Sequence, residues 1–193
     1  MAVRTHTVAA WISEYLAPPQ MLLAGLLFLG MAGPFPLAAV SAAVAAVFAV
    51  GLPRLLVRWG VDQGWLSDPH LSQRRQRVVV LPGAMVCVTL GLSLLVAIHA
   101  PRTLVRSLVA ILVGAVVVLA VTTVWKISLH TGAVAAVGTV LALSVNPWWA
   151  LTVAVAVPVG WSRVVLRRHS RAQVVAGALL TPLTTVLTFH FFR

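Results

Sequence analysis

Long apolar runs, separated by short polar turns, make up most of the chain. Turn signals such as the Gly-Pro-Phe-Pro segment at 33–36 and the Asn-Pro pair at 146–147 stand between the runs. A helix of about 20 apolar residues crosses a bilayer, and runs of this length are too long for barrel strands. The pattern predicts an all-α fold, a polytopic transmembrane helix bundle with about six to seven membrane segments. The expected hydrophobic segments lie at about 18–33, 36–57, 78–99, 105–125, 126–145, 150–161 and 171–190.

We expect residues 1–193 to form a single transmembrane domain. Two polar segments interrupt its succession of apolar runs. Residues 1–17 are expected to form an interfacial N-terminal segment, with a short helix over 5–16. Residues 58–77, the longest polar stretch, are expected to form a loop. On the N-terminal helix the expected apolar side carries Trp11, Ile12, Tyr15 and Leu16.

Composition agrees with a membrane protein. The 193 residues are 61% hydrophobic and 9% charged, with a mean hydropathy of +1.02. Soluble domains carry roughly 25% charged residues, so this chain is not built for water. Its surroundings are therefore expected to be a lipid bilayer.

The charges are strongly basic, with 14 Lys and Arg against three acids. In a membrane protein this excess indicates either the positive-inside bias or an anionic ligand rather than nucleic acid. If every run crosses, eleven basic residues share one face and three lie on the other, which favours a cytoplasmic location for the richer face. The richer face holds Arg4, Arg54, Arg58, Arg74, Arg75, Arg77, Lys126, Arg163, Arg167, Arg168 and Arg171, and the other holds Arg102, Arg106 and Arg193.

The three acids also restrict the chemistry. Prenyl or alcohol-phosphate transferases that use magnesium need clustered aspartates, because this hard cation takes oxygen ligands. Glu14, Asp62 and Asp68 form no acid-rich repeat, and no glycosidase-type carboxylate pair is indicated. We expect no metal and no cofactor.

Two polar motifs carry candidate chemistry on the basic face. The segment "KISLHTG", 126–132, opens a helix, where free backbone N–H groups favour an anion. In "GWSRVVLRRHSRAQVVAG", 160–177, Gln173 follows His169 by four residues and is expected to orient its imidazole. The alternative for the first motif is an interfacial histidine with a snorkelling lysine, and for the second a juxtamembrane basic loop.

Ser162, Arg163 and His169 form a Ser-Arg-x5-His pattern, and upstream Ser128 is followed by His130. The two patterns resemble the second and third motifs of the type 2 phosphatidic acid phosphatase superfamily, whose site is shared with the vanadium haloperoxidases. The "HSRAQVVAG" segment is similar to a variant third motif of bacterial branches, which implies the bacterial plasma membrane. In place of the family's Pro-Ser-Gly-His, this chain has Ile-Ser-Leu-His.

The resemblance implies a role for each matching residue. His169 would be the nucleophile that forms a phosphohistidine, His130 the general acid, and Gln173 the group that orients His169. Phosphate oxygens would be held by the remaining candidates, Arg163, Ser128, Ser162, Lys126, Arg74, Arg75 and Arg77.

The chain departs from the family pattern at two places. Gln173 replaces the aspartate that ends the third motif, and no exact Lys-x6-Arg-Pro first motif precedes Pro82. Arg74, Arg75 and Arg77 are therefore candidates as a group for the first motif.

The expected function is a membrane-integral lipid phosphatase that hydrolyses a polyprenyl or phosphatidic acid-like phosphate or diphosphate without a metal. Its expected partners are the lipid phosphate substrate and the bilayer, with no nucleic acid. The alternatives are a lipid phosphotransferase, in which an alcohol replaces water, and a catalytically degenerate relative that binds anionic lipid.

Overall fold

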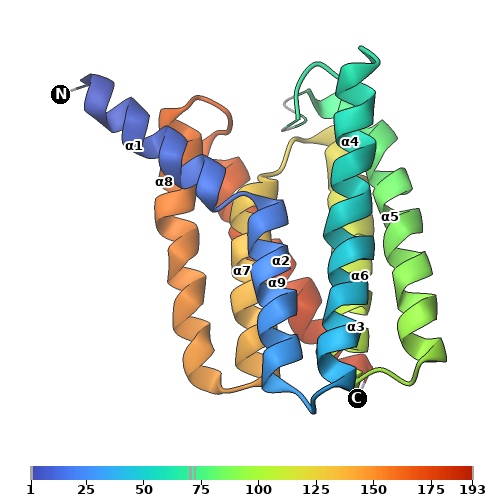
Figure 1. The fold of residues 1–193 in the computed structure, drawn as a ribbon. Coiled ribbons are helices and arrows are strands. Elements are labelled where there is room, and N and C mark those ends of the chain that lie inside the picture. Colours follow the sequence, from blue (N-terminus) through green and yellow to red (C-terminus); the bar gives the residue numbers. More distant parts are fainter. Residues whose placement is uncertain (1, 70, 72, 193) are drawn as a thin grey trace. The chain divides into compact units, whose positions relative to one another are not determined.

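The structure is a computed structural model that describes residues 2–69, 71 and 73–192, without the side chains of residues 2 and 3 (Figure 1). His70, to which the sequence assigns no role, and Arg193 lie outside the described residues. Its contacts divide the chain into two compact units. Unit 1 comprises residues 2–25 and 126–191, and unit 2 comprises residues 26–125 with Phe192. One helix, α2 (Pro18–Ala32), contributes to both units.

Unit 1 is built from helices that come from both ends of the chain. Its core contains Val134, Ala135, Ala156 and Val159, against which Ile12, Leu16 and Met21 pack. Gly138 allows close packing, because a Cβ there would come within 2.6 Å of the Thr152 hydroxyl. Besides the first part of α2, its elements are α1 (Ala2–Tyr15), α7 (Leu129–Ser144), the 3₁₀ segment η2 (Pro147–Val155), α8 (Ala156–Val165) and α9 (Arg171–Phe191).

Unit 2 contains the middle of the chain. The π-helical turn η1 connects α3 and α4 within one long apolar segment, Leu37–Asp62. A small cluster of Leu66, Leu71 and Val80 anchors the 63–73 connection to the start of α5. Besides the rest of α2, its elements are α3 (Leu37–Ala46), η1 (Val47–Gly51), α4 (Leu52–Asp62), α5 (Arg74–Ala97) and α6 (Arg102–Val124).

The predicted all-α, polytopic bundle is confirmed. Among the described residues, five helical segments are long and apolar enough to cross a membrane, or six if the bent pair of α1 and α2 counts as one span. The predicted segment at 126–145 corresponds to α7, which has 16 residues. At about 1.5 Å per residue it is shorter than the roughly 30 Å hydrocarbon core. Its small residues instead let the other helices of unit 1 pack closely around it.

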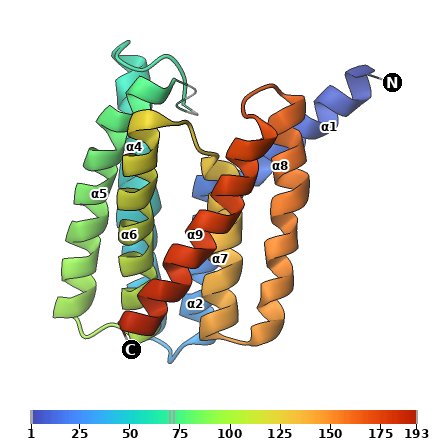
Figure 2. The same cartoon turned by 180° about the vertical axis from the view of Figure 1, so that it is seen from behind.

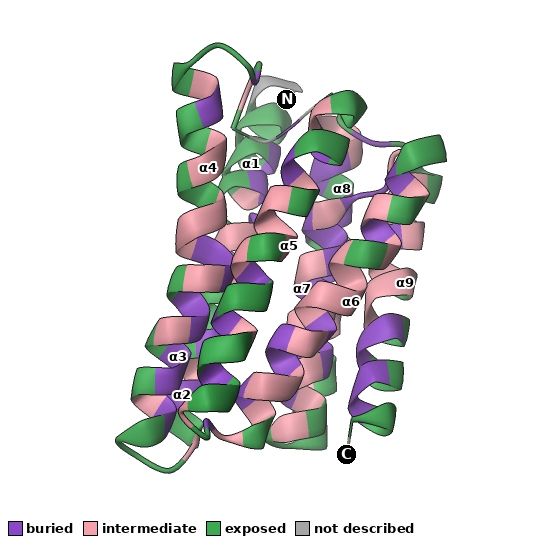
Figure 3. Ribbon diagram, turned by 90° about the vertical axis from the view of Figure 1, so that its right-hand side faces the viewer, coloured by how far each residue is buried: buried purple, intermediate pink, exposed green. Residues whose placement is uncertain are grey.

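Apolar side chains remain exposed along the helices, as expected for a protein solvated by lipid. On α5, Val79 is 75% exposed, whereas Leu95 is fully buried. Figure 3 shows the alternation of buried and exposed positions along this helix. In water, an exposed apolar surface of this kind would promote association, but in a bilayer it contacts lipid tails.

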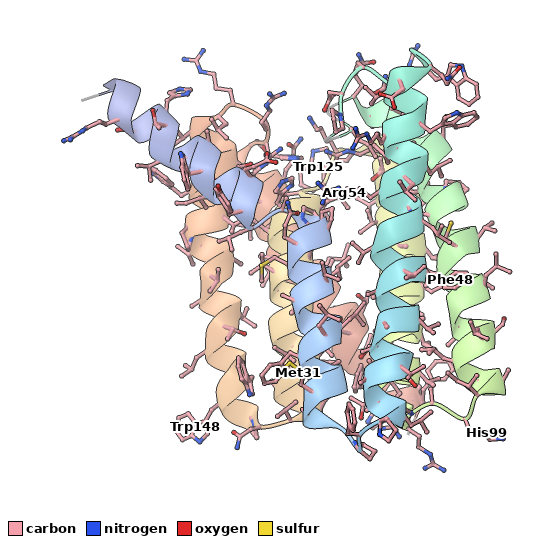
Figure 4. The ribbon with its side chains drawn as sticks, in the orientation of Figure 1. Met31, Phe48, Arg54, His99, Trp125 and Trp148 are labelled. Carbon is pink, nitrogen blue, oxygen red and sulfur yellow. The ribbon has the colours of Figure 1, made fainter. Side chains whose placement is uncertain are left out.

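The polar connection of unit 2 is shorter than the predicted 58–77 loop. Helix α4 continues to Asp62 and α5 begins at Arg74, so the connection between these two helices spans 63–73. Long arginine side chains can cover apolar surface while their charged ends reach water, which lets helices continue through these polar sequences. Figure 4 shows Arg54 and Trp125 toward one end of unit 2 and His99 at the other.

The N-terminal helix agrees only partly with the predicted apolar side. Ile12 and Leu16 pack against the core of unit 1. Trp11 and Tyr15 are instead about 60% exposed and stack on each other with ring centroids 4.7 Å apart. The stacked pair is therefore placed to lie at a membrane interface, where such amphipathic rings are at home.

Candidate active site

The sequence motifs of unit 1 meet where three helices have their ends. Helix α8 ends there, and α7 and α9 both begin there (Figure 2). Arg163 lies in the last turn of α8, His130 in the first turn of α7, and His169 just before α9. All three side chains are at most 6% exposed. Seven of the ten predicted site residues lie in unit 1, and the other three lie in unit 2.

A helix-ending turn brings His169 back to Arg163. The N–H groups of Arg168 and His169 both donate to the carbonyl oxygen of Arg163, at 3.0 and 3.3 Å, and the N–H of Arg167 donates to that of Val164 at 3.0 Å. Arg167 has a left-handed backbone, with φ of 53°. These are the bonds and the conformation of a Schellman motif. The turn explains physically why five residues separate Arg163 from His169.

The first turn of α9 is closed by a reciprocal pair of hydrogen bonds. The N–H of Ser170 donates to the side-chain oxygen of Gln173 at 3.1 Å, and the N–H of Gln173 donates to the Ser170 hydroxyl at 3.3 Å. This Ser-x-x-Gln arrangement is a capping box. The same oxygen of Gln173 lies 3.1 Å from Nδ1 of His169. The predicted contact between His169 and Gln173 is therefore present, although α9 begins at Arg171, after His169.

The start of α7 is fastened to the start of α9. The N–H of Ser128 donates to the carbonyl oxygen of Gln173 at 3.2 Å, and the Thr131 hydroxyl donates to that of Val174 at 3.0 Å. Gly177 permits this approach, because a Cβ there would overlap the carbonyl oxygen of Ser128. The two histidine motifs, about 40 residues apart in sequence, are thus held at one junction of backbone segments.

Arg163 and Lys126 have partners that bear on the site. An Nη of Arg163 donates to the hydroxyl of Ser13, which lies on α1 and is 6% exposed. Nζ of Lys126 donates to the carbonyl oxygen of Arg168 at 3.1 Å, in the connection that carries His169. Sequence reasoning missed Ser13, whose only signal is a small polar residue on the packed side of an N-terminal helix.

The serine candidates differ in their surroundings. Ser128 is the N-cap of α7, and the N–H of Thr131 donates to its hydroxyl over a long 3.5 Å. Ser162 is fully buried, and its hydroxyl donates to the carbonyl oxygen of Val159 in its own helix at 2.7 Å. Ser128 is therefore the better placed of the two to turn its hydroxyl toward a ligand.

The first-motif candidates belong to unit 2 and have structural contacts there. Nε of Arg77, which is 2% exposed, donates to the carbonyl oxygen of Leu71 at 2.8 Å. An Nη of Arg74 donates to the carbonyl oxygen of Thr123 at 2.7 Å, near the C-terminus of α6, where a cation is favoured. Arg75 is exposed. These contacts give Arg74 and Arg77 a structural role, whatever their part in chemistry.

The unit 1 junction combines a buried cation, two buried imidazoles and two helix N-termini. Nε2 of His130, Nε2 of His169 and Nε of Arg163 are all shielded from solvent. Helix N-termini and a guanidinium both favour an anion with several oxygens, and an imidazole can act as nucleophile, acid or base. Within the described part of the chain, no group of three or more His, Cys, Asp or Glu residues could hold a metal ion.

Comparison with known proteins adds no relative. No protein-family model, no curated protein and no solved structure matches this chain.

Proposed function

We propose that this membrane protein is a lipid phosphatase that hydrolyses a lipid phosphate or diphosphate through a phosphohistidine at His169. The observation that carries the proposal is the hydrogen bond between Nδ1 of His169 and Gln173, next to the buried Arg163. That bond directs Nε2, the opposite ring nitrogen, away from Gln173. An oriented imidazole close in the fold to a buried arginine is suited to nucleophilic attack on phosphorus.

In the first step, the lone pair on Nε2 of His169 attacks phosphorus, and the bond from phosphorus to the leaving oxygen breaks. His130 donates a proton to that oxygen, so that a lipid alcohol or a lipid monophosphate departs. Charge accumulates on the equatorial phosphoryl oxygens, which Arg163, Ser128 and the N–H groups at the start of α7 are suited to stabilise. In the second step, His130 removes a proton from water, and the water oxygen displaces His169 to release phosphate.

The substrate class follows from where the junction lies. Its helices present apolar surface that can contact a lipid tail, while the ends of α7, α8 and α9 carry the polar groups. A substrate with an anionic headgroup and an apolar tail would fit both the polar helix ends and the apolar helix surface. Polyprenyl phosphates and diphosphates and phosphatidic acid-like lipids are of this kind.

The test is phosphate release by the purified full chain in lipid nanodiscs. The substrates would be a polyprenyl monophosphate, a polyprenyl diphosphate and phosphatidic acid, each with and without a chelator and vanadate. We expect release that resists the chelator, is inhibited by vanadate, and is abolished by His169→Ala.

His190→Ala is the matched control, because His190 is an exposed histidine at the far end of α9. Substrate labelled at the transferred phosphoryl group should leave acid-labile label on the wild type and the control, but not on His169→Ala. Phosphate release by His169→Ala at the wild-type rate would refute the proposal. Transfer of the label to an added alcohol in place of water would identify a phosphotransferase instead.

A further inference from the structure

The capping box of α9 touches the proposed nucleophile through a single atom. The side-chain oxygen of Gln173 lies 3.1 Å from the backbone nitrogen of Ser170 and 3.1 Å from Nδ1 of His169. A glutamine amide has one oxygen, which accepts, and one nitrogen, which donates. Either the oxygen or the nitrogen of the Gln173 amide could point toward Ser170 and His169. The donors and acceptors of these two residues decide which atom does so.

The backbone N–H of Ser170 decides this orientation, because it can only donate. The amide atom that faces it must be an acceptor and is therefore the oxygen. Nδ1 of His169 faces the same oxygen and must then carry the proton. The lone pair of the neutral ring is consequently on Nε2. If the amide were reversed, its NH₂ group would face the Ser170 N–H, and the proton of His169 would move to Nε2.

We propose that Ser170 is a positioning residue of the site: it fixes the amide of Gln173 and thereby holds His169 in the tautomer whose Nε2 can attack phosphorus. The role in attack rests on the proposed function, whereas the tautomer does not. Replacing a catalytic aspartate by asparagine in a serine protease costs about 10⁴ in rate, through the wrong tautomer. The capping box prevents the wrong tautomer of His169, because it fixes the amide of Gln173 with its oxygen toward the ring. A neutral glutamine can therefore orient the ring.

A purely structural explanation makes different predictions. A capping box stabilises a helix start whatever the neighbouring residue is, and Ser170 would then affect only the stability of α9. Gln173→Glu separates the two explanations. The two oxygens of a carboxylate are both acceptors, so Nδ1 of His169 would keep its proton however the group rotates. In the Gln173→Glu background, the N–H of Ser170 therefore has no effect on the tautomer of His169.

The experiment reads the tautomer directly. Full-length protein with ¹⁵N-labelled histidine is placed in nanodiscs, and the ring nitrogens of His169, assigned by loss of its signals in His169→Ala, are observed by NMR at a pH where the ring is neutral. We expect Nδ1–H in the wild type, the opposite of the Nε2–H form that a solvated histidine prefers. Ser170→Pro, which lacks the N–H, should shift the population toward Nε2–H. The same change in the Gln173→Glu background should leave the tautomer as Nδ1–H.

Ser170→Ala provides a second variant that keeps the backbone N–H and the fold. Losing the hydroxyl loosens the turn that places the Ser170 N–H against Gln173, so kcat should fall by up to about fivefold, with little change in KM, if the roughly 1 kcal/mol of the cap is lost from this contact. Ser170→Thr, which can still cap, should restore kcat. In the Gln173→Glu background, Ser170→Ala should lower stability but leave kcat nearly unchanged.

The possible outcomes are distinct. An Nε2–H tautomer in the wild type overturns the proposal, and so does an equal loss of kcat from Ser170→Ala in both backgrounds. If the tautomers behave as expected but no lipid phosphate is hydrolysed, the orientation by Ser170 stands and the proposed function fails.

Discussion

Replacing Gly177 with alanine should damage the junction that holds both histidine motifs. A Cβ at this position would overlap the carbonyl oxygen of Ser128 and come within 3.3 Å of its carbonyl carbon and 2.8 Å of the Thr131 hydroxyl. The hydroxyl can rotate away, but the carbonyl belongs to the backbone at the start of α7. Inserting a methyl group into a packed site costs about 1–3 kcal/mol. We expect the upper half of this range, because a backbone segment has to move.

The same displacement should reduce activity more than stability alone explains. Moving the start of α7 away from α9 stretches the hydrogen bond from the N–H of Ser128 to the carbonyl of Gln173, at 3.2 Å in the structure. His130 then shifts relative to His169. A misplacement of about 1 Å can cost on the order of 100-fold in rate. We therefore expect a loss of at least tenfold in kcat per folded molecule.

Gly51→Ala is the matched control in a helical segment. The nearest atom to a Cβ there is the carbonyl oxygen of Ala46, at an ordinary 3.8 Å. Gly-to-Ala changes at compatible positions stabilise by about 0.4–1 kcal/mol. Unfolding by denaturing detergent, followed by circular dichroism, gives the stabilities, and phosphate release gives kcat. If Gly177→Ala proves as stable and as active as Gly51→Ala, the close contact between α7 and α9 is wrong.

Three further substitutions test separate contacts. Ser13→Ala removes the hydroxyl that accepts a hydrogen bond from Arg163. Loss of this bond, worth about 1 kcal/mol, should raise the KM for a lipid phosphate about fivefold. An unchanged KM would contradict a role for α1 in the site. Arg167→Gly should raise the unfolding free energy by about 1 kcal/mol without lowering kcat, because glycine adopts the left-handed conformation without strain; a loss of stability would contradict the turn. Arg77→Ala leaves a carbonyl of the 63–73 connection unsatisfied and should lower the unfolding free energy by about 1–3 kcal/mol, whereas Arg75→Ala at an exposed position should not.

Hydropathy was sufficient to predict the helices but not all of their ends. A run of apolar residues must form a helix in lipid, because only a helix satisfies the backbone within one segment. That argument weakens at the membrane surface, where water can satisfy the backbone. The sequence from Arg58 to Asp62 is polar enough for a loop, yet it is the last part of α4. Composition carries no information on whether a solvated segment remains helical.

Motif spacing predicted contacts between residues that are close in the sequence. It could not predict contacts between residues that are far apart in the sequence. His169 and Gln173 are four residues apart, and their contact was expected from a helix beginning near 168; the contact is present, but α9 begins at Arg171 and the capping box with Ser170 makes it possible. Ser13 reaches Arg163 across 150 residues, through the packing of α1 on α8. No pattern within either segment encodes that packing, because the pattern of each segment reports on its own helix and not on the helix that packs against it.

The spacing of the Ser-Arg-x5-His segment has a physical meaning that the letters alone do not show. Two helix-terminus motifs follow one another with a single residue, His169, between them. Arg163 is the acceptor of the Schellman turn, Arg167 is its left-handed residue, Ser170 is the N-cap of α9, and Gln173 is the third helical residue. His169 stands between the two motifs, so one inserted or deleted residue would separate it from Arg163 or from Gln173. The polar cluster is tolerated beside apolar helices because its backbone groups are bonded within these two motifs.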